Sequence, residues 1–205
     1  MVDALFIDPR GVYPKLLGPE HCWGEDRDAR TYAGSGPVLL HPPCAAWCLL
    51  AGVREARYGY PRGEDGGLFA FALETLRRCG GVLEHPAYSK AWDRYGLTKP
   101  RKGEGWLYEG EAVGGGVWVC QVSQCAYGHA ARKRTWLIYV GGRAPYDLNW
   151  SEPFVSGSVV ISGSNNHGVN PSARRMWTRE AKATPPLFAA ELISLAEWSK
   201  GVDKP

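Results

Sequence analysis

The chain has 205 residues, of which 44% are hydrophobic and 22% charged, and its formal net charge is +3. This is the composition of a globular protein, and the length suffices for one domain with a full core. The sequence holds no run of about 18 apolar residues and no signal peptide at its start. We therefore expect a single domain over residues 1–205, located in the cytoplasm, with no membrane partner.

The first half of the chain predicts alternating strands and helices. Apolar residues 5–7 and Val38–Leu40 indicate two short strands, and residues 45–57 are expected to be partly helical. In Leu68–Cys79 the apolar positions recur at helical spacing, and two glycines close that helix before a strand over Gly80–Pro86. The order strand, helix, strand predicts a parallel unit.

The second half predicts two more strands, Val117–Val122 and Trp136–Gly141. Residues 142–176 are polar and loop-like, which indicates a small insertion. A helix is expected over Pro186–Ser199, because proline is well tolerated at a helix start. Together these elements predict an α/β fold.

The six cysteines are irregularly spaced and form no Cys-x-x-Cys pair. Disulfides are unexpected in a cytosolic protein. His41, Cys44 and Cys48 lie close in sequence, but zinc ligands usually come as paired knuckles. We expect no metal site.

The charge is unevenly distributed along the chain. Residues 1–40 hold four Lys/Arg against six Asp/Glu, whereas residues 90–143 hold nine against four. The basic segment is interleaved with tryptophans and tyrosines, which suits a polyanion that carries stackable bases. The alternative, a solvated basic face, follows equally well from charge alone.

Three segments carry residue types suited to chemistry at strand ends. Cys44 follows a predicted strand on a turn stiffened by two prolines, and Glu84 lies near the end of the next strand. Open α/β sheets present reactive groups at this edge. A third segment, residues 127–135, carries the consecutive cations Arg132, Lys133 and Arg134 just before another predicted strand.

These segments resemble the motifs of DNA cytosine-5 methyltransferases. Pro43-Cys44 resembles the Pro-Cys nucleophile motif, and Glu84-His85-Pro86 resembles the Glu-Asn-Val/Pro motif. Residues 127–135 resemble Tyr-Gly-x-Pro-Gln-x-Arg-x-Arg. Thr178-Arg179-Glu180-Ala181 resembles the Thr-x-Arg-Glu-Ala that follows the recognition region, and residues 184–189 resemble the start of the last helix. The resemblance runs in family order from residue 36 to residue 199.

The resemblance implies a Rossmann-like, methyltransferase-type fold with a mostly parallel sheet, shortened on its N-terminal side. Residues 142–176 would be a short DNA-recognition insertion. The family opens with a Phe-x-Gly-x-Gly loop for S-adenosylmethionine, but residues 5–10 lack that loop. The half that handles the base therefore resembles the family better than the half that handles the cofactor. Such a compact chain resembles accessory enzymes of mobile elements or bacterial viruses, which would place it in a host cytoplasm.

The resemblance also implies roles for particular residues and a DNA partner. The implied catalytic residues are Cys44, Glu84, Lys133 and Arg132. The implied contacts to S-adenosylmethionine are Phe6, Asp8, Pro43, Thr184 and Pro185. The implied contacts to DNA are Arg134, Thr135, His129, Arg174 and Arg175.

The implied reaction explains why these residue types belong together. A thiolate from Cys44 adds to carbon 6 of the base, which makes carbon 5 nucleophilic. Glu84 meets N3 of the base as an acid if burial raises its pKa. A cation such as Lys133 or Arg132 grips O2 and lowers the pKa of the thiol. The base must leave the helix to reach this pocket.

Two alternatives stand beside methyl transfer. One is modification, exchange or removal of a substituent at carbon 5 of a pyrimidine without S-adenosylmethionine. The other is a non-catalytic DNA-binding relic or decoy. Cofactor binding separates methyl transfer from the first alternative, and covalent trapping on DNA with a 5-fluoro base separates both enzymes from the second.

Overall fold

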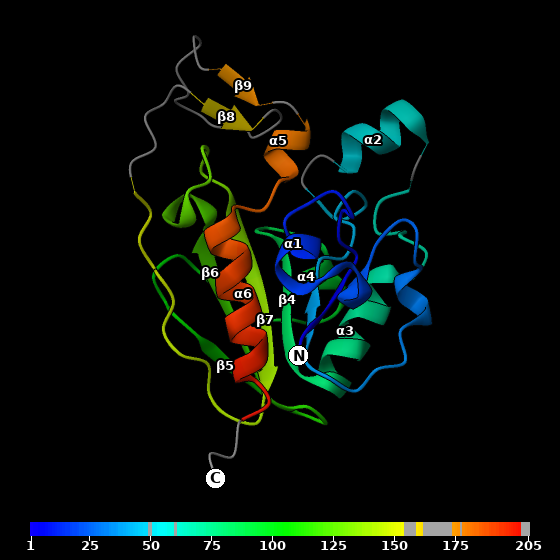
Figure 1. The fold of residues 1–205 in the computed structure, drawn as a ribbon. Helices are drawn as coiled ribbons and strands as arrows, with labels where there is room; N and C mark the ends of the chain where they lie inside the picture. The colour runs from blue at the N-terminus through cyan, green and yellow to red at the C-terminus, as the bar shows by residue number, and fades with distance from the viewer. Residues whose placement is uncertain (49–50, 60, 154–158, 162–173, 177, 202–205) are drawn as a thin grey trace.

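The computed structural model describes residues 1–48, 51–59, 61–153, 159–161, 174–176 and 178–201, which form an α/β fold (Figure 1). The strands are β1 (Asp3–Leu5), β2 (Cys22–Trp23), β3 (Val38–Leu40), β4 (Gly81–Pro86), β5 (Leu107–Ala112), β6 (Gly115–Ser123), β7 (Arg134–Gly141), β8 (Val159–Ile161) and β9 (Arg174–Met176). The helices are α1 (Tyr13–Leu17), α2 (Ala51–Tyr58), α3 (Leu68–Cys79), α4 (Ala91–Arg94), α5 (Thr178–Lys182) and α6 (Pro186–Trp198). Three short 3-10 helices are η1 (Pro19–His21), η2 (Ala29–Thr31) and η3 (Gln124–Tyr127).

Seven strands form one mixed sheet in the order β2-β1-β3-β4-β7-β6-β5. The pairs from β2 through β4 are parallel, and the pairs from β4 through β5 are antiparallel. The expectation of a mostly parallel sheet therefore holds only at one edge. Because β7 runs against β4, its first residues meet the last residues of β4: Thr135 lies opposite Pro86.

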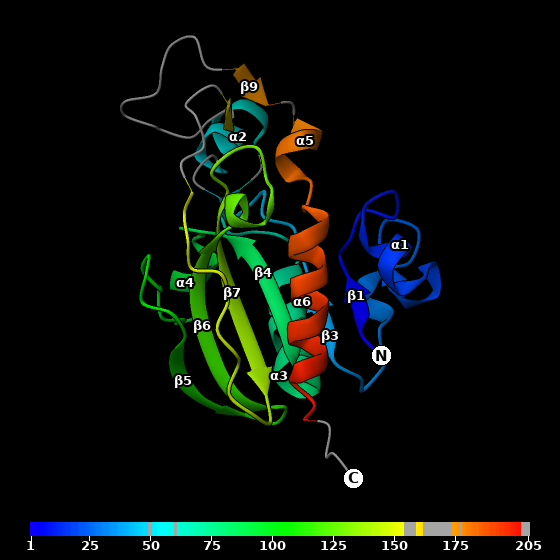
Figure 2. The ribbon, with the colours of Figure 1, turned by 60° about the vertical axis from the view of Figure 1, so that its left-hand side comes forward.

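Helices cover both faces of the sheet (Figure 2). On one face α3 packs on β3 and β4, with Phe69, Leu73 and Leu76 against Val38, Leu40 and Leu83. On the other face α6 packs on the same two strands, with Phe188, Leu192 and Leu195 in a cluster that includes Leu39, Val82 and Leu137. Alternate residues of each strand serve opposite faces, as the two-residue period of a strand requires. The sheet is therefore the middle of three layers.

The parallel unit formed by β3, α3 and β4 confirms the sequence prediction. Helix α3 has the predicted bounds, and its apolar stripe is buried. It begins where Asp65 accepts hydrogen bonds from the backbone N–H groups of Gly67 and Phe69, at 3.0 and 2.9 Å. It ends at Gly80, whose φ of 73° favours glycine.

The strand predicted over residues 5–7 is wrong. Strand β1 ends at Leu5, and the backbone of Phe6 has a φ of 61°, which breaks a strand. Helical structure between residues 45 and 57 is confirmed in part, since α2 begins only at Ala51. Strand β5, with its irregular pairing at Tyr108 and Gly110, was not predicted from the sequence.

The predicted insertion, residues 142–176, has no helix or strand over 142–153. Within the described remainder, β8 and β9 pair in parallel as a separate two-stranded sheet. Figures 1 and 2 both place this small sheet at the same end of the molecule as α2 and α5. Among the described helices, none has the length and apolar character needed to cross a membrane.

Candidate active site

The carboxyl ends of β3 and β4 bring His41 and Glu84 together. Leu40 is the register partner of Leu83, so the next residue on each strand, His41 and Glu84, also lie side by side. Leu40 and Leu83 point to the face covered by α3. Because successive side chains alternate between the two faces, those of His41 and Glu84 point to the face covered by α6. The Nδ1 atom of His41 lies 2.9 Å from Oε2 of Glu84.

The second carboxylate oxygen of Glu84 is bound by Gln124, the first residue of η3. The Gln124 amide donates to Oε1 of Glu84 at 3.1 Å and to Oγ1 of Thr135 at 2.9 Å. Gln124 and Thr135 are fully buried, and Glu84 is 8% exposed. Both oxygens of the carboxylate therefore have partners, which buried carboxylates require.

The other ring nitrogen of His41 contacts α1. Its Nε2 lies 2.7 Å from the hydroxyl of Tyr13, which is buried. The Thr184 side chain hydrogen-bonds to that same hydroxyl. A continuous chain thus runs from Thr184 through Tyr13 and His41 to Glu84.

Glu84 remains ionised in this setting. Burial alone would raise its pKa, but the hydrogen bond and charge of His41, with Lys133 and His85, outweigh burial and lower the pKa to about 2. Glu84 was expected to act as an acid if burial raised its pKa, but the net shift is downwards. The reason is that His41, which the sequence analysis considered only as a metal ligand, binds the carboxylate.

Cys44 begins a helical turn that two neighbouring segments hold in place. The backbone N–H groups of Trp47 and Cys48 donate to the Cys44 carbonyl at 3.0 and 2.9 Å. The Trp47 indole donates to Asp65 at 2.8 Å, and the Trp47 carbonyl accepts from the N–H of Lys90 at 2.9 Å. The turn is therefore tied both to the start of α3 and to the segment after β4.

The thiol of Cys44 is surrounded by charges of both signs. Burial raises its pKa above the ordinary value, and the charges of Cys48 and Glu84 raise it further, while Lys182 and Lys133 lower it by less. Lys133 thus acts on the thiol as expected, but the net pKa shift is opposite to the prediction. Lys182, in α5, was not predicted from the sequence.

Lys133 and Arg132 point to different partners. The Lys133 ammonium donates to the carbonyls of Lys182 and Ala183 at 3.3 and 3.4 Å. Arg132 instead lies 3.6 Å from the carboxylate of Glu152. Of the two cations predicted to grip the base, Lys133 is the one that acts on Cys44.

Glu152 collects three cations beside β7. Lys102 and Arg134 contact its carboxylate at 2.7 and 2.9 Å, in addition to Arg132. The side chain of Glu152 is only 6% exposed, and these cations help to lower its pKa to about 2 against the effect of burial. The cluster carries a net positive charge, and its cations are partly exposed.

The remaining residues predicted to contact DNA differ in position. Thr135 is fully buried and His129 is 7% exposed, with Nδ1 of His129 2.8 Å from the Ala131 carbonyl. Neither faces solvent, so direct DNA contact by these two is not supported. Arg174 and Arg175 form part of β9, but their side chains lie outside the described part of the structure.

The predicted cofactor contacts are largely engaged with the protein itself. The Phe6 ring packs edge-on against Phe71, with centroids 6.3 Å apart. Asp8 accepts from the backbone and side chain of Arg10 at 2.9 and 3.3 Å. Thr184 bonds to Tyr13. Pro185 is buried, and Pro43 is exposed.

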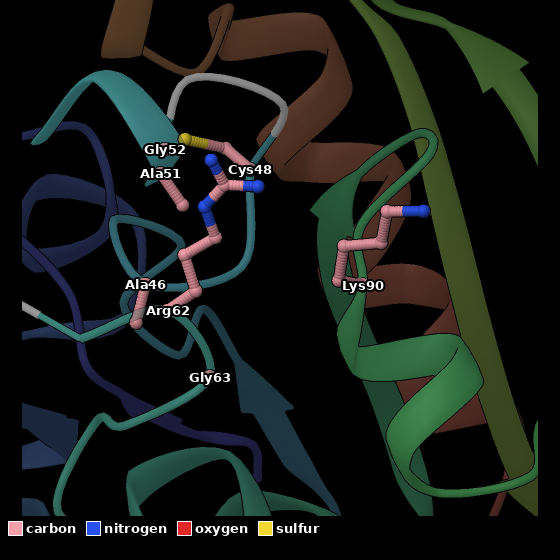
Figure 3. Close-up of a pocket in the computed structure, with 7 residues that line it drawn as sticks. All are labelled: Ala46, Cys48, Ala51, Gly52, Arg62, Gly63 and Lys90. Atoms are coloured by element: carbon pink, nitrogen blue, oxygen red, sulfur yellow. The ribbon is translucent and has the colours of Figure 1, made fainter. Parts of the chain in front are cut away.

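A pocket of about 250 Å³ lies on the other side of the Cys44 turn (Figure 3). Arg62 reaches into it beside Ala46 and Cys48, whereas the side chain of Lys90 points away. Cys44 does not line this pocket. The pocket therefore lies beside the turn that begins at Cys44 and does not include the Cys44 thiol.

His85 and the cysteines do not form a metal centre. His85 is fully buried among Phe69 and Trp92, and neither ring nitrogen reaches hydrogen-bond geometry. Burial lowers its pKa to about 4, although Glu84 and the Pro43 backbone act in the opposite direction. The described residues hold no cluster of three or more His, Cys, Asp or Glu side chains suited to a metal ion.

Sequence reasoning missed Tyr13, Gln124 and Lys182 as members of this site, and considered His41 only as a metal ligand. His41 carried a usable signal, since it directly precedes Pro42-Pro43-Cys44 at a strand end. The others depend on where α1, η3 and α5 pack, which no local pattern reveals.

No family model, no curated protein and no solved structure matches this chain. The arrangement of its own residues is thus the basis for a functional proposal.

Proposed function

We propose that this protein acts on carbon 5 of cytosine in DNA through a covalent bond between Cys44 and carbon 6 of the base. The observation that carries the proposal is the juxtaposition of a thiol turn and a hydrogen-bonded carboxylate on adjacent parallel strands. The five sequence motifs, in family order, support the same assignment.

The chemistry follows from the residues at the sheet edge. The Cys44 thiolate adds to carbon 6, and the π electrons of the ring move towards N3, where Glu84 supplies a proton. Lys133 and Lys182 favour the thiolate, since their charges lower the pKa of Cys44. Carbon 5 then carries the electron density needed to bond to an electrophile, and loss of a proton from carbon 5 allows the thiolate to leave.

Gln124 favours cytosine among the pyrimidines. Its Oε1 is buried and has no hydrogen-bond partner in the described part of the chain. A buried acceptor without a partner is costly, and the amino group of cytosine would supply the missing donor. Thymine presents a carbonyl at that position and would leave the cost in place.

DNA is the proposed carrier of the base because cations gather near the site. Lys133, Lys182 and the three cations around Glu152 lie on or beside the start of β7. Tyr88, which is 47% exposed and packs against Trp136, offers an aromatic surface after β4. Cations that contact phosphates and aromatics that stack on bases are the usual means of holding a nucleic acid strand.

The proposal assigns no step to S-adenosylmethionine, because Phe6, Asp8 and Thr184 are engaged with neighbouring residues. This observation favours a second candidate: exchange or removal of a substituent at carbon 5 through the same adduct, without that cofactor. Deuterium uptake at carbon 5 in heavy water tests the adduct without any cofactor, since addition of Cys44 alone makes carbon 5 basic.

The test uses mass spectrometry with DNA that contains cytosine or 5-fluorocytosine. The wild-type protein is expected to exchange the carbon 5 hydrogen and to form a protein–DNA adduct. Cys44→Ser should do neither, because a hydroxyl is a far weaker nucleophile near neutral pH. Cys48→Ser is the matched control and should retain both. Absence of exchange and adduct in the wild type, or their persistence in Cys44→Ser, would refute the proposal.

A further inference from the structure

The ionised state of Glu84 leaves a chemical requirement unmet. A carboxylate whose pKa is about 2 carries no proton near neutral pH, yet the base must gain one at N3 as the thiolate adds. The proton must therefore come from a group that touches Glu84. His41 is such a group, with Nδ1 2.9 Å from Oε2.

The hydrogen bonds around His41 define a direction. The hydroxyl of Tyr13 keeps its proton, because burial and the charge of Glu84 raise its pKa well above the ordinary value. The relay uses the neutral tautomer of His41 in which Nε2 accepts from Tyr13 across 2.7 Å and Nδ1 donates to Glu84. The Tyr13 oxygen accepts a hydrogen bond from the side chain of Thr184, a half-buried residue.

We propose that Thr184, Tyr13 and His41 form a proton relay that supplies Glu84, with His41 as a positioning residue that acts on the base only through Glu84. The inference rests on the proposed function and deepens it by naming the source of the proton. It assigns a use to Tyr13 and His41, which neither the motifs nor the covalent chemistry require.

The protons and electrons balance along the relay. As the sulfur–carbon 6 bond forms, N3 takes a proton from Glu84 while Glu84 takes the Nδ1 proton of His41. Nε2 of His41 takes the proton of Tyr13, and Tyr13 is refilled through Thr184 from solvent. When the thiolate leaves, the N3 proton returns by the same path, so each group recovers its starting state.

Other charged groups face this relay and must be counted. The charges of Lys133, just before β7, and of His85, on β4, lower the pKa of Glu84. The charge of Glu84 in turn raises the pKa of the Cys44 thiol. None of them is hydrogen-bonded to Glu84, whereas His41 and Gln124 are. Gln124 is an amide and does not titrate, so His41 alone among the bonded partners can pass a proton.

A second cluster of a carboxylate, a histidine and a tyrosine serves as a control for the relay. Asp3 accepts from the Tyr32 hydroxyl at 2.9 Å, and its other oxygen lies 2.9 Å from Nδ1 of His21. Here the same three residue types meet at the amino end of β1, away from Cys44. Both the histidine and the tyrosine bind the carboxylate, so no path leads through the imidazole.

The experiment measures the rate of adduct formation on 5-fluorocytosine DNA at about pH 6 and about pH 8 for wild type, His41→Asn and His21→Asn. Asparagine keeps a donor where Nδ1 was, but it does not titrate. His41→Asn should change the dependence of the rate on pH, because it removes both the relay and the imidazole that lowers the pKa of Glu84. The ratio of wild-type rate to His21→Asn rate should stay constant.

Tyr13→Phe and Tyr32→Phe provide a second matched pair that is gentler on folding. Tyr13→Phe cuts the proton supply to His41 but keeps the bond between His41 and Glu84, so the pKa of Glu84 stays low. The ratio of wild-type rate to Tyr13→Phe rate should grow at least about tenfold from pH 6 to pH 8, and the ratio for Tyr32→Phe should stay constant. A constant ratio for Tyr13→Phe, with an active wild type, would overturn the relay and leave the proposed function standing. A wild type that forms no adduct at either pH would overturn both.

Discussion

Two sets of carboxylate, histidine and tyrosine lie near opposite ends of the parallel strands of one sheet. In Asp3, His21 and Tyr32 the carboxylate is the centre, and both partners bind to it. In Glu84, His41 and Tyr13 the imidazole is the centre, with the carboxylate on one nitrogen and the phenol on the other. The two sets share their kinds of side chain and differ in the order of their hydrogen bonds. The proposed relay depends on that order.

The largest difference between the two sets should appear in the reaction itself. Glu84→Gln should slow adduct formation on 5-fluorocytosine DNA by about 100-fold or more, since general acid catalysis is worth at least that factor. Asp3→Asn should change the rate by less than about twofold. Adduct formation can be followed by mass spectrometry. Equal losses in the two variants would mean that the clusters are equivalent and that Glu84 is structural.

The second difference concerns stability and its dependence on pH. The folded-state pKa of Glu84, about 2, lies below its ordinary value, so its ionised form stabilises the fold above about pH 4.5, and this contribution disappears as the pH falls towards 2. Glu84→Gln should lower the free energy of unfolding by roughly 3 kcal/mol at pH 7, with little difference near pH 2. Asp3→Asn should cost less, because the Asp3 side chain is 20% exposed. Urea unfolding at several pH values measures this, and a Glu84→Gln deficit that persists at pH 2 would contradict it.

The third difference lies in the charges around each set. Glu84 is bound by Gln124 and feels the charge of Lys133, both in the basic segment over residues 90–143, whereas all three residues of the Asp3 set lie in the acidic segment over residues 1–40. DNA affinity should fall at least about tenfold between 50 and 200 mM salt, and Arg132→Gln should reduce the slope of log K against log salt by about 1. Arg30→Gln, in the acidic segment, should leave the slope unchanged. Fluorescence anisotropy over a salt series measures both, and a flat salt dependence would argue against DNA.

The smallest expected effect is that of S-adenosylmethionine. Because Phe6, Asp8 and Thr184 are engaged with neighbouring residues, calorimetry should give a dissociation constant weaker than about 100 μM. Adduct formation should proceed at the same rate without it. Micromolar binding to the free protein would instead restore methyl transfer as the favoured reaction.

The parts of the fold that could be predicted from the sequence are those with a local pattern. The apolar stripe of α3 and the two glycines after it defined that helix, and parallel pairing of β3 with β4 then placed His41 beside Glu84. Strand β5 could not be predicted, since its residues alternate weakly and its pairing is irregular at Gly110. The end of β1 was misplaced because an apolar Phe6 adopts a left-handed backbone.

The sequence motifs singled out Cys44, Glu84 and Lys133, and the structure shows electrostatic effects among all three. The direction of those effects was not predictable. The pKa of Glu84 was predicted with the wrong sign, since it depends on His41, and the position of His41 is fixed in turn by Tyr13. Contacts between segments so far apart in sequence leave no local trace.

The reversed direction of β7 has a consequence for the order in which the chain folds. Residues 38–86 can form the β3-α3-β4 unit by local pairing, so the thiol turn and the carboxylate can be in place early. The partner strand of β4 begins only at Arg134, and it brings Thr135, while the preceding η3 brings Gln124. Closing that long loop is slower than forming the unit. The carboxylate and His41 are thus assembled before Gln124, which binds the second carboxylate oxygen, and hydrogen exchange should find β7 protected later than β4 during refolding.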